Sequence, residues 1–332
     1  MSSAEPLVSV VIAAFNSELY IEAAVSSVVH QTLSDIEIII VDDGSPDETL
    51  ACVRRLALRD DRIRILALPT NGGVSRARNA GIEMARGQWV SIVDSDDLIC
   101  RTRLERLVEA GERDQADIVC DNMLFFYDEE QNREEVIAGG ALLKEPKWID
   151  LETYILGNCL ERGSPSLGHL QPTIRLKTLR QTGALYDEKL TIAEDYHFVQ
   201  LLLAAGAKMR VYPWLTYFYR KRSSSASHRL TLPALAAMLD ADVRFRTSLV
   251  AQLPHIRTAL DRRTRGMLRM FAAIELVSAI KKRRLNDMFK IACRQPHAPL
   301  QLFDWLAARV SRGIRAKWVA PIGATASPKN DN

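Results

Sequence analysis

Short apolar runs alternate with amphipathic segments along the first 120 residues of the chain. Continuous apolar runs predict buried strands, and apolar residues at helical spacing predict helices. The predicted strands are residues 7–14, 36–41, 62–68 and 89–93, and the predicted helices are residues 18–31, 47–59, 72–86 and 101–109. Ser17 is expected to cap the first helix. Apolar strands separated by helices predict an α/β fold with a mostly parallel central sheet covered on both faces.

The alternation ends after residues 117–122. A polar, acidic stretch at residues 127–135 is expected to form a hairpin or an excursion from the sheet. The next predicted elements are helices at residues 151–156 and 195–205 and strands at residues 208–212 and 215–220. From residue 230 onward helix-forming residues and arginines dominate, and the last ten residues have the composition of a disordered tail.

The composition is that of an ordinary globular protein. The chain has 332 residues, 47% of them apolar, which is enough for about two domains. Its 5 cysteines form no C-x-x-C pair, so neither a disulfide framework nor a zinc site is indicated. The sequence shows no signal peptide and no apolar run of about 18 residues, so we expect a cytoplasmic protein.

Charge is distributed unevenly along the chain. Residues 1–120 carry a net charge of about −8 and residues 229–332 about +12. An acidic first half argues against nucleic acid as a partner. The basic cluster at residues 281–284 fits a solvated helix face, and it also fits peripheral contact with anionic lipid at the inner face of the cell membrane. The first lysine is Lys144, which excludes Walker A and kinase lysines from the first half.

Three carboxylates follow the apolar run at residues 89–93, namely Asp94, Asp96 and Asp97. The carboxyl end of a parallel strand is where open α/β sheets bind their ligands. Carboxylates this close repel one another unless a cation joins them, and Asp-x-Asp suits Mg²⁺ or Mn²⁺ shared with substrate phosphates. A bare Asp-x-Asp is more often a solvated acidic turn, so the metal site depends on the surrounding sequence.

The ends of the first and second predicted strands carry residues that could bind a nucleotide. Residues 10–16 end the first strand with small residues and an aromatic, and Ala14 and Phe15 can border a base there. Asp42 and Asp43 end the second strand, where a carboxylate can accept from a base N–H or a ribose hydroxyl.

Two further segments fit the same ligand. Residues 71–79 open a helix with an amide-rich turn and bring Arg76 or Arg78 near a phosphate or a base. Glu194 and Asp195 form a second acidic pair at the start of a helix, where mutual repulsion should raise the pKa of one carboxyl. A carboxylate with a raised pKa suits proton abstraction near neutral pH.

Together and in this order, these motifs resemble the inverting glycosyltransferases of family 2, which have the GT-A fold. Residues 6–121 match the family pattern closely, and residues 194–222 match it more loosely. The Glu-Asp pair followed by Tyr217-x-Tyr219-Arg220 is similar to bacterial enzymes that build exopolysaccharide, including the succinoglycan type.

The resemblance implies a metal-dependent transfer from a nucleotide-sugar donor, with a UDP-sugar favoured, to a hydroxyl of a glycan or lipid-linked acceptor. The implied roles are base contact for Asp42, support of that loop for Asp43, nucleotide contact for Arg78, ribose or metal contact for Asp94, binding of diphosphate-bound Mn²⁺ or Mg²⁺ for Asp96, and catalytic base for Asp195. The family often has proline where this chain has Ala13 and Ala14, and the QxxRW motif of processive synthases is missing. The missing motif favours addition of one sugar per acceptor.

The expected organisation is a nucleotide-sugar-binding half at residues 1–121 and an acceptor-binding half with the base at residues 122–228 in the same domain. A basic helical region at residues 229–322 and a disordered tail at residues 323–332 follow. Two other functions stay open. A haloacid-dehalogenase-like phosphatase also has Asp-x-Asp after a strand, although Asp97 stands where that class has Thr or Val. A non-catalytic nucleotide-sugar-binding scaffold is the second alternative.

Overall fold

The computed structural model describes residues 5–127, 134–136, 143–160, 166–221 and 230–282. The chain divides into two compact units, Met1–Gly266 and Met267–Asn332. The described part of the second unit is the last part of helix α9, which spans Pro254–Lys281. The predicted tail and the last two residues of the basic cluster lie outside the described residues. The predicted division at residues 121, 228 and 322 stays a functional prediction.

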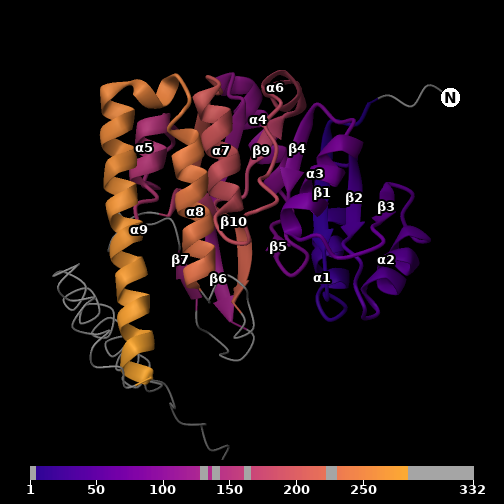
Figure 1. The fold of residues 1–332 in the computed structure, drawn as a ribbon. Coiled ribbons are helices and arrows are strands. Elements are labelled where there is room, and N and C mark those ends of the chain that lie inside the picture. The colour runs from indigo at the N-terminus through magenta and orange to yellow at the C-terminus, as the bar shows by residue number, and fades with distance from the viewer. Residues whose placement is uncertain (1–4, 128–133, 137–142, 161–165, 222–229, 283–332) are drawn as a thin grey trace, which may run out of the picture. The chain divides into compact units, whose positions relative to one another are not determined.

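A mixed sheet forms the centre of the first unit (Figure 1). Its described strands are β1 Val8–Ala14, β2 Ile36–Asp42, β3 Ile63–Ala67, β4 Trp89–Ile92, β5 Leu98–Ile99, β6 Ile118–Tyr127, β7 Glu134–Val136, β8 Lys147–Ile149, β9 Thr173–Arg175 and β10 Met209–Lys221. They lie in the order β3-β2-β1-β4-β9-β6-β10-β5, with β7 beside β6 and β8 beside β10. Strands β3, β2, β1, β4, β6 and β10 run in one direction, while β9 is antiparallel to both of its neighbours. The predicted mostly parallel sheet is therefore confirmed.

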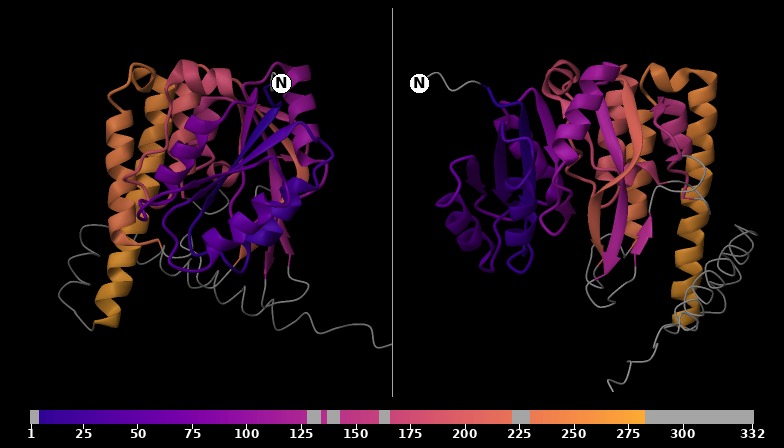
Figure 2. Two further views of the ribbon diagram at one scale, coloured as in Figure 1. Left: turned by 90° about the vertical axis from the view of Figure 1, so that its right-hand side faces the viewer. Right: turned by 180° about the vertical axis from the view of Figure 1, so that it is seen from behind.

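Helices cover this sheet, and Figure 2 shows them from two further directions. The described helices besides α9 are α1 Ile21–Val29, α2 Thr49–Ala57, α3 Val74–Met84, α4 Arg103–Asp114, α5 Leu151–Leu156, α6 Leu176–Thr182, α7 Glu194–Ala204 and α8 Leu232–Phe245. Strands β1 and β2 are almost completely buried, as expected for parallel strands rich in Val and Ile with both faces covered. Helix α3 packs on β1 so closely that a Cβ on Gly81 would lie 2.4 Å from Cγ1 of Val11.

Two details of the sequence prediction are wrong. Helix α1 begins at Ile21, and the hydroxyl of Ser17 lies 2.7 Å from the hydroxyl of Ser95 instead of capping the helix. The two strands predicted at residues 208–212 and 215–220 form one strand, β10, whose pairing with β6 shifts around Pro213. Proline has no N–H to donate to a neighbouring strand, so the sequence pattern is interrupted there although the strand continues.

Candidate active site

The carboxyl ends of β1, β2 and β4 meet at one edge of the sheet, as expected for parallel strands. Ala14 pairs with Asp42, and the N–H of Asp43 donates to the carbonyl of Ala14 at 2.9 Å. The Ser17–Ser95 hydroxyl contact at 2.7 Å connects the loop after β1 to the loop after β4. The structure therefore brings the predicted nucleotide and metal residues of the first half together.

Arg78 on α3 joins the loop after β4 to the start of α7. Its Nη2 donates to Asp94 Oδ1 at 2.7 Å, and its Nη1 donates to Glu194 Oε1 at 3.0 Å and to Asp195 Oδ1 at 2.8 Å. The side chain is only 4% exposed. The same guanidinium therefore bonds to both Asp195 and Asp94. The Nε of Arg78 has no hydrogen-bond partner among the described residues, and the nucleotide contact predicted for Arg78 stays a prediction.

Burial and crowded charge change the acidity of these groups. Burial raises the pKa of Asp195 to about 7; Arg78 lowers it, and the charges of Glu194 and Asp94 raise it. Burial also opposes the charge on Arg78, but the carboxylates around it outweigh this effect and raise the pKa of Arg78 well above its ordinary value. A carboxylate with a pKa near neutral can accept a proton at physiological pH. The raised pKa agrees with the expectation from the acidic pair, although burial is the larger cause.

The acidic loop, which we define as residues 94–97, is anchored by Asp97. This carboxylate is 1% exposed, and it accepts from the hydroxyl of Tyr217 at 2.8 Å and from the N–H of Arg220 at 2.7 Å. Burial and the charges of the other two loop carboxylates raise the pKa of Asp97 well above its usual value. Asp97 therefore faces the protein and holds the loop onto β10.

Asp94 is held from three directions. Its Oδ1 accepts from Arg78, and its Oδ2 accepts from Nε2 of Gln171 at 2.9 Å. Its N–H donates to the hydroxyl of Tyr217 at 3.1 Å. The direction of this carboxylate is therefore fixed before any ligand binds.

Asp94 and Asp96 are the residues that fit a divalent cation. Asp96 is half-buried, and its carbonyl accepts from Nε of Arg220 at 2.7 Å. Within the described ranges, no group of three or more acidic, histidine or cysteine side chains closes around a metal position. A pair of carboxylates still suits Mg²⁺ or Mn²⁺, because these ions are often held by one or two carboxylates and by substrate phosphates. The chemistry of the donor set therefore fits the predicted metal.

The acidic pair after β2 has two different environments. Asp43 accepts from the N–H of Gly72 at 2.9 Å and of Gly73 at 2.7 Å, so it holds the turn that precedes α3. Asp42 is 1% exposed, and its Oδ2 accepts from the N–H of Ser45 at 3.3 Å. Its Oδ1 is buried and accepts no hydrogen bond from the described residues. A buried acceptor without a partner is costly, so Asp42 fits a ligand that brings a donor, such as a base N–H.

Ala14 and Phe15 differ in what they can offer a ligand. Ala14 is 1% exposed and Phe15 is 42% exposed. Asn16 then takes a left-handed conformation with φ 51°, which turns the chain at the end of β1. The ring of Phe15 is therefore the exposed feature of this strand end, and Ala14 can contribute only through its backbone.

The residues that support the acidic loop were not among the site residues predicted from the sequence. Gln171 precedes β9 in a segment without any motif, and no sequence signal points to its contact with Asp94. Tyr217 and Arg220 belong to the motif that is similar to exopolysaccharide enzymes, and the structure shows that both bind the acidic loop. The short strand β5, which follows the loop, pairs with β10 and explains why these residues meet.

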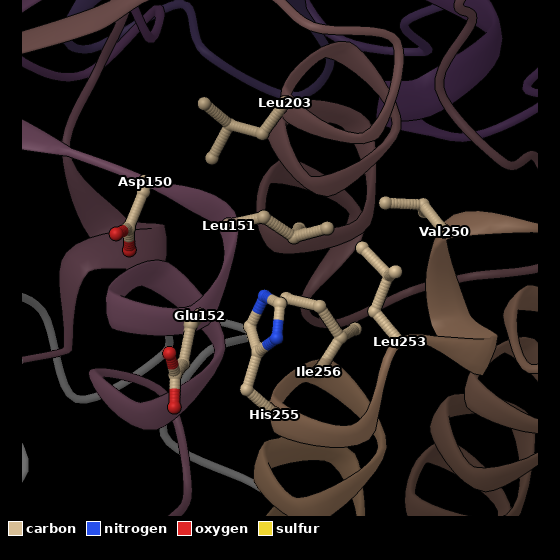
Figure 3. Close-up of a pocket in the computed structure, with 8 residues that line it drawn as sticks. All are labelled: Asp150, Leu151, Glu152, Leu203, Val250, Leu253, His255 and Ile256. Atoms are coloured by element: carbon tan, nitrogen blue, oxygen red, sulfur yellow. The ribbon is translucent and has the colours of Figure 1, made fainter.

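A separate small pocket lies elsewhere in the first unit (Figure 3). It is lined by Leu151, Leu203 and Ile256 and by the polar side chains of Glu152 and His255. Its volume is about 160 Å³, below the range of about 300–1,000 Å³ usual for ligand sites. None of the predicted site residues lines it. The acidic edge of the sheet therefore remains the candidate active site.

Comparison with known proteins identifies the family. A model of "Glycosyl transferase family 2" matches residues 9–164. The succinoglycan biosynthesis protein ExoO of Rhizobium meliloti (strain 1021) is 34% identical over 322 residues, which cover 95% of this chain and 89% of that protein. The chain belongs to glycosyl transferase family 2. This glycosyltransferase also matches the succinoglycan biosynthesis protein ExoU of the same organism, with 30% identity over 237 residues that cover 69% of this chain and 67% of that protein.

Solved structures confirm the fold of this glycosyltransferase. TarS 1–349 of S. aureus in complex with UDP-GlcNAc has a TM-score of 0.60 and 19% identity, and the match covers 87% of this chain and 92% of that chain. The mannosyltransferase PcManGT of Pyrobaculum calidifontis in complex with GDP-Man and Mn²⁺ has a TM-score of 0.58 and 16% identity, covering 94% and 88%. The predicted GT-A type of α/β fold is confirmed. In the part of the chain that the structure describes, no helix is long and apolar enough to cross a membrane.

Proposed function

We propose that this enzyme transfers a single sugar from a nucleotide-sugar donor to a hydroxyl of its acceptor with inversion, and that the transfer depends on Mn²⁺ or Mg²⁺. The observation that carries the proposal is the position of Asp195, which shares the guanidinium of Arg78 with Asp94. Arg78 therefore holds a proton acceptor and one candidate metal ligand close to each other. Inverting transfer needs a proton acceptor on the face of the sugar opposite to the leaving group, and Asp195 is the carboxylate proposed for this position.

Asp195 is proposed to act as the catalytic base. The acceptor O–H gives its proton to Asp195 while its oxygen forms a bond to the anomeric carbon, and the bond from that carbon to the diphosphate oxygen breaks. The electron pair of that bond leaves with the nucleoside diphosphate. A base within hydrogen-bond reach typically contributes about 10²–10⁴ in rate. A single displacement without an enzyme nucleophile gives inversion.

The donor side is proposed to use the edge formed by β1, β2 and the acidic loop. Asp42 Oδ1 is a buried acceptor that a base N–H would satisfy, and the exposed ring of Phe15 lies at the adjacent strand end. Asp94 and Asp96 would hold the cation. When bound, the cation neutralises the negative charge that develops on the leaving diphosphate. Preorganised carboxylates suit this task because they need not move during the reaction.

Surface polysaccharide biosynthesis is the proposed setting, with a glycan or lipid-linked acceptor. Its support is the similarity to ExoO and ExoU, both described as succinoglycan biosynthesis proteins. A UDP-sugar is the favoured donor, and TarS, a neighbour by fold, was solved with UDP-GlcNAc. PcManGT was solved with GDP-Man and Mn²⁺, which supports testing GDP-sugars beside UDP-sugars. Peripheral contact of the basic helices with membrane lipid stays a prediction.

Family membership removes the support for a phosphatase. The scaffold alternative predicts that Asp195 can be changed without effect. Against it, burial raises the pKa of Asp195 to about 7, a value that suits a general base near neutral pH.

Donor hydrolysis tests the proposal. The purified enzyme is incubated with UDP-, GDP- and dTDP-sugars, with Mn²⁺ or with EDTA, and release of nucleoside diphosphate is measured. We expect release from donors of one base, stopped by EDTA and by Asp96→Ala. The matched control is Asp60→Ala, which removes an acid that pairs with Arg62 before the amino end of β3. Release that continues unchanged in EDTA and in Asp96→Ala would contradict the metal role.

A further inference from the structure

Behind the acidic loop lies a buried ion pair that the proposed reaction does not use directly. Arg103, the first residue of α4, is 0% exposed and Asp121 on β6 is 1% exposed. Arg103 Nε donates to Asp121 Oδ2 at 2.9 Å, and Nη2 donates to Asp121 Oδ1 at 2.8 Å. The hydroxyl of Thr216 also donates to this carboxylate. The pair is therefore bidentate, enclosed and fixed in direction.

We propose that Arg103 is a positioning residue that fixes the acidic loop through two neighbours of Asp94. The inference rests on the proposed function, since it assigns a role toward the metal-binding carboxylates. A buried ion pair often adds little to stability compared with well-packed apolar residues of similar size. What such a pair can supply is a set of hydrogen bonds with one geometry.

The first connection runs through Gln171. Arg103 Nη2 donates to the carbonyl of Gln171 at 2.8 Å, and Nε2 of Gln171 donates to Asp94 Oδ2 at 2.9 Å. The guanidinium thus sets the position of the Gln171 backbone, and the side chain of the same residue sets the direction of the Asp94 carboxylate. Gln171 is 3% exposed, so water cannot readily replace either bond.

The second connection runs through Tyr217. The guanidinium carbon of Arg103 lies 5.0 Å from the centre of the Tyr217 ring, which is a cation–π contact in a site without solvent. The hydroxyl of this tyrosine accepts from the N–H of Asp94 at 3.1 Å and donates to Asp97 Oδ2 at 2.8 Å. Both ends of the acidic loop are therefore bound to a ring that rests against Arg103.

A third contact extends the same arrangement to β4. Arg103 Nη1 donates to the hydroxyl of Ser91 at 3.4 Å, and the hydroxyl of Thr173 donates to the same oxygen at 2.9 Å. One arginine thus contacts the strand that leads into the acidic loop, the segment before β9, and β6 and β10. Supporting residues of this kind typically change metal affinity by about 10- to 100-fold when they are altered.

The test compares two buried ion pairs. Arg103→Lys keeps the charge but loses the bidentate fork and the bond to Gln171. The control is Arg263→Lys, which alters a pair with Asp242 whose side chains are both 1% exposed and which lies behind α7. Hydrogen–deuterium exchange of residues 93–98 is measured in the ligand-free, full-length protein, together with Mn²⁺ binding in the presence of UDP or GDP.

Arg103→Lys is expected to speed exchange of the acidic loop by about tenfold and to weaken Mn²⁺ binding by about 10- to 100-fold. Arg263→Lys is expected to leave both quantities within about twofold of the wild type, although a buried pair is disturbed in each variant. Unchanged exchange in Arg103→Lys, or equal acceleration in both variants, would overturn the inference.

Failure of the proposed function and failure of the role of Arg103 give different results in this experiment. A wild-type enzyme that binds no Mn²⁺ with either nucleotide contradicts the proposed function, while the exchange measurement still decides the role of Arg103. If Arg103→Lys does not fold, Gln171→Leu removes only the first connection and leaves the ion pair intact. This variant is expected to speed exchange at Asp94, and unchanged exchange there would reject the proposed connection.

Discussion

Asp94 and Asp195 accept hydrogen bonds from the two terminal nitrogens of one guanidinium, at 2.7 Å and 2.8 Å. Asp94 lies in the acidic loop after β4, and Asp195 lies in the first turn of α7. With Glu194 also bound, three carboxylates share one buried cation. This excess of negative charge in a poorly solvated place helps to keep the pKa of Asp195 high, and it prepares the site for a second positive charge.

Removing the guanidinium should destabilise the enzyme and shift its pH dependence. Arg78→Gln leaves the carboxylates of Asp94 and Asp195 without their counter-charge, and loss of one partner of a buried pair costs about 3–5 kcal/mol. Because Arg78 lowers the pKa of Asp195, its loss should move the acidic limb of the kcat/KM profile to higher pH. Urea unfolding and rates over a pH series measure both effects.

Arg76→Gln is the matched control for this prediction. It removes the same charge from the same helix and leaves the Arg78–Asp195 pair in place. The acidic limb should stay where it is in the wild type. A limb that moves equally in both variants would mean that net charge, and not the contact with Asp195, sets the pKa.

The wild-type pH profile itself is a second prediction. Asp195 can accept a proton only when it is ionised, and its pKa is raised to about 7. Activity should therefore fall as the pH decreases through about 7, and it should be constant on the alkaline side of this limb. Initial rates of transfer across this range give the midpoint. A midpoint near the ordinary aspartate pKa of about 3.9 would contradict the raised pKa of Asp195.

Replacing Asp42 or Asp43 with asparagine should have different effects on stability and on nucleotide binding. Asp43 accepts from two N–H groups of the turn before α3, and hydrogen bonds to a charged group contribute about 1.5–3 kcal/mol. Asp43→Asn should therefore lower the free energy of unfolding by about 2 kcal/mol. Asp42→Asn should change stability less and weaken binding of the free nucleoside diphosphate. Thermal unfolding and calorimetric titration of both variants test this contrast, and equal losses of affinity would contradict it.

The acidic residues at this edge of the sheet could be predicted from the sequence because they come directly after the predicted strands. Asp42 and Asp94 come after buried apolar runs, and parallel strands bring such ends to one edge. The position of Asp195 opposite Asp94 depends on how α7 packs, which no local pattern encodes. The acidic pair was visible in the sequence, the family resemblance assigned the base role to Asp195, and the structure shows that Arg78 binds it.

Three other features could not be predicted from the sequence, and each has a physical reason. Pro213 interrupts the apolar pattern of β10 and hides the continuity of that strand. Gln171 acts through its carbonyl and its amide together, and a lone glutamine carries no signal of such a role. Arg78 was expected to contact a nucleotide because it follows the amide-rich turn at the start of a helix, and no sequence pattern indicates that three carboxylates also bind it.

The most direct test separates donor binding from transfer in Asp195→Asn. Asparagine keeps the size of the side chain but cannot take the proton of the acceptor hydroxyl. We predict that the affinity for the nucleotide-sugar donor stays within about threefold of the wild type while the transfer rate falls by about 10²–10⁴. A variant that transfers sugar at close to the wild-type rate would contradict the account, because the proton would then have another acceptor.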